Sequence, residues 1–338
     1  MLSLNELWFI LIAVLFIGFF FLEGFDFGVG IVARFLGKDD LERRLIINTI
    51  GPFWDANEVW LITAGGAMFA AFPHWYATLF SGFYIPFVLM LLALIVRGVA
   101  FEFRGKMEQK GWKKTWDWAI FFSSLVPALL WGVAMANIVR GVAIDQEKEL
   151  IGSFFDLLNV YALVGGVAAI GIFVLHGLFF ITLRTTGDLQ ERARDAAKKI
   201  GAFVAIVFLI LGIMTYTSTD IFTVHGTGWL ALPILAGVAF LLTGIAAKQK
   251  RDGLAFTMTG AVIILSAASA FIGLFPRVMI SSLNPDFHLT IYNAASGSYT
   301  LKVMSYVSLT LLPFVIASQL WSYYVFRKRL SHPKQLEY

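Results

Sequence analysis

The stretch LWFILIAVLFIGFFFLEGFDFGVGIVARF, residues 7–35, decides what kind of protein this chain is. It exceeds the about 20 apolar residues that an α-helix needs to cross a bilayer core of roughly 30 Å. Within it lie two acids, Glu23 and Asp26. An ionisable side chain in hydrocarbon is costly unless it is paired or hydrated, so such residues mark candidate functional sites. We therefore predict a membrane helix that carries two functional acids.

The rest of the chain has a similar composition. Of its 338 residues, 59% are hydrophobic and 14% are charged, whereas soluble domains are roughly 45–50% apolar and about 25% charged. The chain has no cysteine, which excludes disulfides, iron–sulfur clusters and thiolate metal sites. The composition indicates an all-α integral membrane protein. Its net charge of +4 requires no nucleic acid as partner, because membrane topology accounts for the basic residues.

Nine apolar stretches are long enough to cross the membrane. They lie at 7–35, 52–73, 76–103, 117–139, 157–185, 200–220, 227–247, 254–275 and 303–326. We expect one membrane domain over residues 1–338, which has four parts. These are a first four-helix unit at 1–140, a second at 150–275, an outer loop at 276–302, and a ninth, peripheral helix with a cytoplasmic tail at 303–338. Charged connectors at 37–44 and 187–192 suggest an internal repeat, but two unrelated solvated connectors explain them equally well.

The distribution of lysine and arginine predicts the orientation, because cytoplasmic loops are enriched in both. Alternate loops collect most of the 26 basic residues. The opposite loops carry only Arg140, Lys148, Arg277 and Lys302, and Arg97 lies inside a span. The N-terminus is therefore expected outside and the C-terminus in the cytoplasm. The first stretch lacks the basic region and cleavage site of a signal peptide, so we expect it to be a retained helix.

Five charged residues fall at about the same depth in the first three spans. They are Glu23 and Asp26 in the first, Asp55 and Glu58 in the second, and Arg97 in the third. At a rise of about 1.5 Å per residue, all five lie in the cytoplasmic third of the membrane. Members of each acid pair are spaced i,i+3 and share a helix face. Beside Asp26, Gly24 and Gly28 form a G-x-x-x-G motif that permits close helix packing.

This cluster of charges has more than one interpretation. A row of acids that exchange protons could form the mouth of a proton path from the cytoplasm. Alternatively, Glu58, Asp55 and Glu102 could lie at helix ends and reach the membrane interface. Asp26 and Arg97 could form a purely structural ion pair.

The chain offers few ligands for a cofactor. Of its five histidines, only His176 lies well inside a span, and a haem with two protein ligands or a zinc site needs more. We interpret His176 as a packed, hydrogen-bonded residue, with a polar path or a ligand role as alternatives. The segment GVGIVA at 28–33 follows no strand, so it is no dinucleotide site. The residues alone are compatible with a secondary transporter or with one subunit of a proton-coupled enzyme.

Several motifs resemble subunit II of cytochrome bd-type quinol oxidases. They are GFDFGVG at 24–30, GPFWDANEVWLI at 51–62, RGVAFEFR at 97–104, and residues of the segment 284–301. Length and number of helices are similar over the whole chain, whereas residues 105–275 are similar only in hydropathy.

The resemblance implies a membrane oxidase that reduces O2 to water with electrons from a quinol. Protons for that water would come from the cytoplasm, so turnover would generate a membrane potential. This chain would be the haem-free subunit, without a complete active site, in a bacterial cytoplasmic membrane. The partner subunit I would hold two haems b and one haem d and bind the quinol. Further expected partners are membrane lipid and a small single-helix accessory subunit, and a purely structural role for this chain is the alternative.

The resemblance also implies residue roles. Asp26 and Asp55 match membrane acids of the family, and Asp55 is the best match for a proton path toward the haems. Glu23 and Glu58, which lie at a similar depth in the membrane, complete the predicted proton pathway.

Three further residues complete the predicted site. Arg97 matches a buried arginine whose suggested partner is Asp26, and we assign Arg97 and Glu102 to structural ion pairing. Trp60 matches a residue associated with an apolar route for O2. None of the predicted residues is expected to be catalytic or to bind a cofactor or metal.

Overall fold

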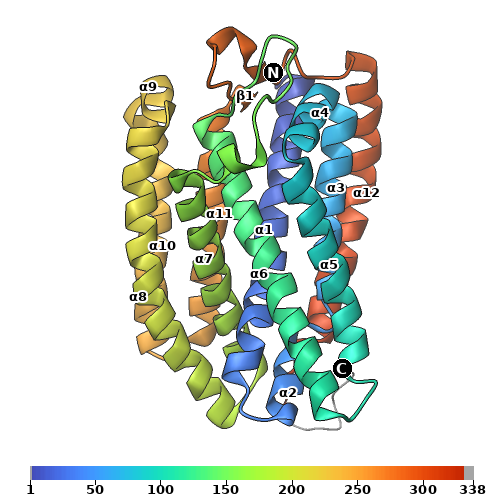
Figure 1. The fold of residues 1–338 in the computed structure, drawn as a ribbon, viewed down its shortest axis with the longest axis vertical. Helices are drawn as coiled ribbons and strands as arrows, with labels where there is room; N and C mark the ends of the chain where they lie inside the picture. Colours follow the sequence, from blue (N-terminus) through green and yellow to red (C-terminus); the bar gives the residue numbers. More distant parts are fainter. Residues whose placement is uncertain (1, 331–338) are drawn as a thin grey trace.

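The computed structural model describes residues 2–330 as a bundle of long helices that stand side by side (Figure 1). The helices are α1 (Leu4–Leu36), α2 (Asp40–Ile50), α3 (Trp54–Ala71), α4 (Pro73–Gly82), α5 (Tyr84–Arg104), α6 (Lys110–Arg140), α7 (Val160–Arg184), α8 (Gly187–Ser218), α9 (Ile221–His225), α10 (Ala231–Lys248), α11 (Asp252–Leu274) and α12 (Ser298–Val325). Three short 3₁₀ helices lie at Phe154–Leu157, Gly226–Leu230 and Pro285–Phe287, and two strands are β1 (Arg277–Met279) and β2 (Leu289–Thr290). The predicted all-α class is confirmed.

Within residues 2–330, eight helical segments are long and apolar enough to cross a membrane. They coincide with eight of the nine predicted spans. The exception is the stretch 52–73, which forms α3. With Asp55, Asn57 and Glu58 among its 18 residues, α3 has no stretch of that length as apolar as those of the other eight, although it stands alongside α1 and α12 in the bundle (Figure 1).

The predicted third span, 76–103, is not one continuous helix. The chain forms α4, leaves helical geometry at Phe83 and resumes as α5. Pro86, in the first turn of α5, cannot donate a main-chain hydrogen bond to the carbonyl of Gly82. The missing bond favours a break at this point.

The two charged connectors that suggested a repeat differ in structure. Residues 37–44 contain a turn and then begin the separate helix α2, whereas residues 187–192 are the first turns of the 32-residue helix α8. Both connectors lead from a long helix into the next one, and the internal repeat stays a prediction.

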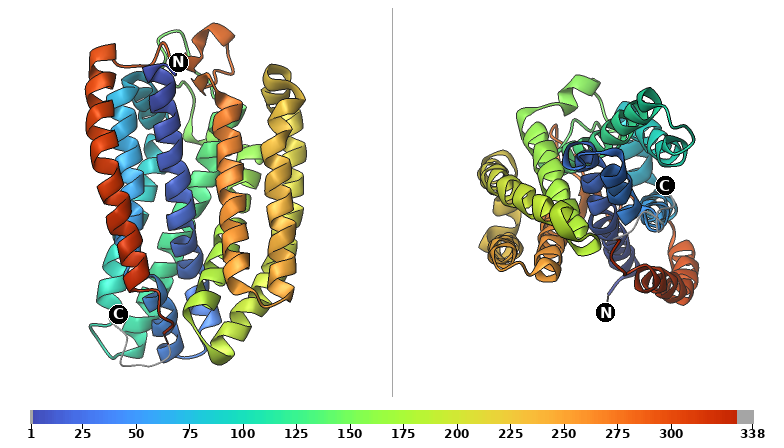
Figure 2. Two further views of the ribbon diagram at one scale, coloured as in Figure 1. Left: turned by 180° about the vertical axis from the view of Figure 1, so that it is seen from behind. Right: turned by 90° about the horizontal axis from the view of Figure 1, so that it is seen from below.

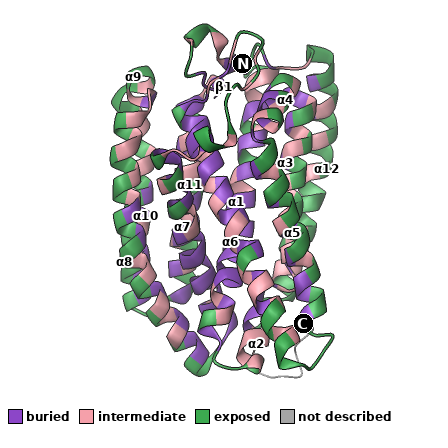
Figure 3. Cartoon of the chain, in the orientation of Figure 1, coloured by how far each residue is buried: buried purple, intermediate pink, exposed green. Residues whose placement is uncertain are grey.

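Helix α1 is the central element of the bundle, and most of its second half is buried (Figure 3). Its start is fixed by a capping box, in which the Ser3 N–H donates to Glu6 Oε2 at 2.7 Å. Gly28 lets α1 approach α7 closely, since a Cβ there would lie 1.9 Å from the main-chain oxygen of Phe173. The predicted close helix packing at the glycine motif is confirmed.

Helix α12 lies at the edge of the bundle, as the view along the helices shows (Figure 2). Most of its surface is exposed. Near its start, the indole N–H of Trp8 is 3.0 Å from both the Leu301 carbonyl and Ser305 Oγ. The helix begins at Ser298, five residues before the predicted boundary.

Ion pairs join the helices at the end of the bundle where α2 lies, which we call the α2 end (bottom of Figure 1). Asp117 of α6 accepts hydrogen bonds from Arg104 Nε at 2.7 Å and from Arg43 Nη1 at 3.1 Å. Arg192 of α8 lies 2.6 Å from Glu42 of α2. These contacts connect both halves of the chain.

The opposite end, which we call the β1 end, is covered by the predicted outer loop. β1 pairs with β2 in an antiparallel ladder, and Ser281 Oγ donates to the Ile144 carbonyl at 2.6 Å. Arg277 Nη2 donates to Asp220 Oδ1 at 2.9 Å. The segment 276–297 is thus an ordered cap that leads into α12.

Candidate functional site

Arg97 lies at the centre of a buried polar cluster formed by α1, α3 and α5. Its Nη2 forms an ion pair with Glu23 and lies 3.3 Å from Glu58 Oε2. Arg97 and Glu23 are fully buried, whereas Glu58 keeps 20% of its side-chain surface exposed. The guanidinium carbon lies 4.7 Å from the centre of the Phe27 ring, a cation–π contact. Three helices therefore present one cation and two carboxylates to each other.

Asp26 is held by Asn57, and both side chains are fully buried. Asn57 Nδ2 donates to Asp26 Oδ2 at 2.7 Å. The oxygen of the same amide accepts from the Tyr323 hydroxyl at 2.8 Å and from Gln319 Nε2 at 3.1 Å. Since Gln319 and Tyr323 belong to α12, the peripheral helix completes the site.

Several buried atoms of the cluster have no hydrogen-bond partner among the described residues. They are Glu23 Oε2, Asp26 Oδ1, and Nε and Nη1 of Arg97. A buried polar group without a partner costs about 1–3 kcal/mol, and more if it is charged. The free oxygens of Glu23 and Asp26 can accept a hydrogen bond or a proton, whereas the guanidinium of Arg97 stays charged and can only donate hydrogen bonds.

The structure brings four of the predicted residues together and leaves one acid outside. Glu23, Asp26, Glu58 and Arg97 form the cluster. Asp55 lies one helical turn before Glu58 but is exposed on the outer face of α3. The predicted site thus consists of a buried cluster of four residues and one acid, Asp55, at the surface of the chain.

The predicted partners of Arg97 need correction. Across residues 2–330, Arg97 pairs with Glu23 and Glu58, and no ion pair joins it to Asp26 or Glu102. Glu102 follows Arg97 by five positions, which places it about 140° around the helix at 3.6 residues per turn, and it is exposed. Asp26 instead accepts the hydrogen bond from Asn57.

Trp60 packs between α1 and α12. Its indole N–H donates to Gln319 Oε1 at 2.7 Å, and a Cβ at Gly18 would lie 2.4 Å from its ring. The O2 route assigned to it stays a prediction.

Sequence reasoning missed Asn57, Gln319 and Tyr323. A signal existed for the two amides, because both lie in apolar stretches, where side-chain amides need hydrogen-bond partners. Tyr323 carried no such signal, since a tyrosine near the end of a membrane helix is typical of the interface.

His176 is packed and hydrogen-bonded, as predicted. Its Nδ1 lies 2.8 Å from Thr259 Oγ1, and its ring is stacked on Phe256 with centroids 4.3 Å apart. One nitrogen and one ring face are thus occupied, whereas Nε2 is buried and has no hydrogen-bond partner among the described residues. That this chain ligates no haem stays a prediction. Over the described part of the chain, no group of three or more histidines and acids could hold a metal ion.

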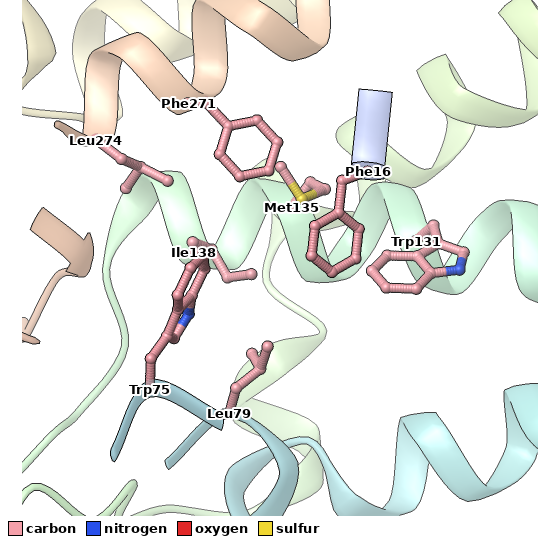
Figure 4. A pocket seen from close by; sticks show the side chains of 8 residues that line it. All are labelled: Phe16, Trp75, Leu79, Trp131, Met135, Ile138, Phe271 and Leu274. Atoms are coloured by element: carbon pink, nitrogen blue, oxygen red, sulfur yellow. The ribbon is translucent and has the colours of Figure 1, made fainter. Parts of the chain in front are cut away.

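Two cavities lie away from the acid cluster. Figure 4 shows the smaller one, of about 10 Å³, among aromatic and aliphatic side chains that include Phe16, Trp75 and Trp131. The larger one, of about 1010 Å³, lies among α6, α7, α8, α10 and α11. Its walls are mostly apolar, so they suit an apolar chain better than a charged group.

Comparisons with known proteins agree on one family. The family model described as cytochrome bd terminal oxidase subunit II matches residues 4–326. The chain is 56% identical to cytochrome bd ubiquinol oxidase subunit 2 of Bacillus subtilis over 338 residues, which cover 100% of both chains. It is 37% identical to cytochrome bd-I ubiquinol oxidase subunit 2 of Escherichia coli K12, over 95% of this chain and 93% of that protein.

The fold is also similar to that of a solved structure. A chain of the bd oxidase from Geobacillus thermodenitrificans superposes with a TM-score of 0.76, covering 96% of this chain and 98% of that chain. At 16% identity, this match supports the fold alone.

Proposed function

Because this chain belongs to the cytochrome bd terminal oxidase subunit II family, we propose that its buried cluster handles the protons that a quinol oxidase consumes. The chain is a multi-pass subunit of a respiratory terminal oxidase in the bacterial plasma membrane. Family membership excludes the secondary transporter as the main function. We further propose the orientation of the chain in the membrane, its partner subunit and the path by which protons reach the cluster.

We place the α2 end in the cytoplasm and the β1 end outside. The support is the enrichment of arginine and lysine at the α2 end, which includes Arg43, Arg104 and Arg192, together with the positive-inside rule. The cluster lies toward this end, because Asn57 and Glu58 are in the first turns of α3, which follows α2. Protons would then enter from the cytoplasm.

The partner is subunit I, which pairs with this chain in the oxidase. Electrons would pass to O2 through two haems b and one haem d in that subunit, where the quinol also binds. This chain supplies no haem ligand in the proposal, which is supported by the hydrogen bond of His176 to Thr259 and its stacking on Phe256. A small single-helix subunit and membrane lipid are further expected partners.

One observation carries the proton path. Glu58 touches the buried Arg97 while part of its surface stays exposed, and Asp55 lies one turn away on the exposed face of the same helix. An unpaired carboxylate at membrane depth requires a polar partner or water. We therefore place the contact with subunit I at this face of α3, with Asp55 and Glu58 between the partner and the buried acids Glu23 and Asp26.

The experiment compares Asp55→Asn, Glu58→Gln and Asp26→Asn in the purified complex, reconstituted in liposomes. Proton-transfer groups typically contribute about 10²–10⁴-fold to a rate, so we expect quinol-driven O2 consumption and membrane potential to fall at least about tenfold. Haem content should stay near the wild-type value. The matched control is Glu102→Gln, which neutralises an exposed acid of α5. Unchanged turnover and potential in the three variants would refute the proton role.

A second candidate function is structural. The fully buried ion pair between Arg97 and Glu23 could serve only to lock α5 onto α1. In that case Glu23→Gln would lower the amount of assembled complex, while the turnover per haem of Asp55→Asn and Asp26→Asn, which lie outside the pair, would remain normal.

A further inference from the structure

The end of α7 and the end of α12 are joined by hydrogen bonds in both directions. Arg184, the last residue of α7, donates from Nη1 to the carbonyl of Phe326, which caps α12. In return, the N–H of Leu330 donates to the Arg184 carbonyl at 2.8 Å. We call this reciprocal contact the Arg184 clasp.

Arg184 is a buried cation that is stabilised without a carboxylate. It is 6% exposed, and no ion pair holds it within residues 2–330. Its guanidinium carbon lies 5.5 Å from the centre of the Phe53 ring. The C-terminal ends of α7 and α12 meet here, and their partial negative charges favour a cation. The arginine is thus suited to hold two helix ends together.

The Arg184 clasp is connected to the acid cluster through ring and hydrogen-bond contacts. Phe53 stacks on Tyr323 with ring centroids 4.4 Å apart and planes 3° from parallel. The Tyr323 hydroxyl donates to Asn57 Oδ1, and Asn57 Nδ2 donates to Asp26. Because α12 is mostly exposed, contacts at its end are important for the position of Tyr323.

The Asn57 amide is the group of the acid cluster that α12 contacts directly. A side-chain amide can present either its NH₂ group or its oxygen to a neighbour. Two donors on α12, Tyr323 and Gln319, face the oxygen, which leaves the NH₂ group for Asp26. If α12 moved away, the amide could rotate and present its oxygen to the carboxylate.

We propose that Arg184 is a positioning residue, which holds the end of α12 so that Tyr323 keeps the NH₂ group of Asn57 on Asp26. This inference rests on the proposed proton function of Asp26. Arg184 touches neither Asp26 nor any other acid of the cluster, so it acts through the helix.

The test is a double-mutant cycle between Arg184→Gln and Tyr323→Phe in the purified oxidase complex. We expect each variant to lower turnover about threefold to tenfold, the range of one net hydrogen bond, and to change the pH profile of turnover in the same way. The double variant should be no worse than the worse single variant, because residues that act through one contact are not additive. Arg184→Lys should restore most of the activity, since an ammonium also donates to a carbonyl.

Arg327→Gln is the matched control. The Arg327 side chain lies over the Tyr324 ring and donates to the Tyr324 carbonyl. No hydrogen bond or ion pair joins this side chain to α7 among residues 2–330, so its loss removes an equal charge without opening the clasp. We expect wild-type turnover and pH profile. Additive effects in the cycle, or an unaltered pH profile in Arg184→Gln, would overturn the proposal. If Arg184→Gln does not assemble, Arg184→Lys takes its place: wild-type turnover together with wild-type hydrogen exchange over residues 319–330 supports the clasp, whereas faster exchange there with wild-type turnover overturns the proposal.

Amide hydrogen exchange over residues 319–330 separates this inference from the proposed function. Faster exchange in Arg184→Gln, with normal exchange in Arg327→Gln, would show that the clasp holds α12. If exchange responds in this way but Asp26→Asn leaves turnover unchanged, the proton function fails. If Asp26→Asn slows turnover but exchange does not respond, the inference about Arg184 fails.

Discussion

Arg97 of α5 and Glu23 of α1 form an ion pair in which both side chains are fully buried. Taking two charges out of water costs several kcal/mol for each ion, and their attraction offsets this only while both are present. Glu58 approaches the same nitrogen of Arg97 at 3.3 Å, but it is partly exposed and can be hydrated. Glu23 therefore depends on Arg97 more than Glu58 does.

From this dependence we predict that Arg97→Met alone sharply reduces the assembled complex. The change leaves Glu23 buried without a partner, a destabilisation of about 3–5 kcal/mol. Combining it with Glu23→Gln should restore part of the assembly, whereas Asp26→Asn should not, because Asp26 bonds to Asn57. Haem content per purified complex measures assembly. If Glu23→Gln and Asp26→Asn restored assembly equally well, the assigned pair of Arg97 and Glu23 would be contradicted.

The charged part of the site could be predicted from the sequence because a charge in an apolar stretch is conspicuous. The partners of Arg97 could not be predicted in this way. The spacing of residues within a helix shows which side chains share a face, but it does not show which helix packs against that face. Asp55 and Glu58, three positions apart, differ by about 60° around the helix. That angle is enough to leave one exposed and bring the other to Arg97.

The neutral residues of the site, and one feature of the fold, were harder to predict. Asn57, Gln319 and Tyr323 become a hydrogen-bond network only when α12 lies beside α3, and no local pattern determines that contact. The break at Phe83 depends on Pro86, which a hydropathy reading treats as one more residue of a long apolar stretch.

A second prediction concerns the contact between α1 and α7. Gly28→Ala would place a Cβ 1.9 Å from the Phe173 carbonyl oxygen, so the helices must separate, and such overpacking costs typically about 1–3 kcal/mol. We expect a lower midpoint of thermal denaturation for the purified complex. Gly244→Ala is the control, because that exposed position in α10 has open space around it and alanine favours a helix. An equal effect of both changes would contradict close packing as the cause.

A third prediction concerns His176. If it is a packed residue and no ligand, His176→Phe should leave the haem content and the visible spectrum of the complex unchanged. The aromatic ring retains the stacking on Phe256, while Thr259 loses one partner but keeps a hydrogen bond to the Ala255 carbonyl at 3.1 Å. Stability should therefore fall by only about 1 kcal/mol. Loss of a haem signal would contradict this assignment.

The last prediction concerns acid stability at the β1 end. Burial tends to raise the pKa of Asp220, but the hydrogen bond and charge of Arg277, aided by the charge of His288, outweigh it and lower that pKa. An aspartate in the unfolded chain titrates near pH 3.9. A carboxyl whose pKa is lower in the folded state stabilises the fold above that value, and the contribution is lost as the pH falls through the folded pKa. Because 42% of the Asp220 side-chain surface is exposed, we expect no more than about 1 kcal/mol.

The measurement compares wild type with Asp220→Asn by thermal denaturation of the purified complex from about pH 7 to about pH 3. The variant should denature at a lower temperature at neutral pH, and the difference should shrink below about pH 4, as the native carboxyl also becomes protonated. Asp286→Asn is the control, since this exposed acid of the segment 276–297 forms no ion pair with any described residue. A difference that persists or grows toward low pH would show that the Arg277 pair is not its source.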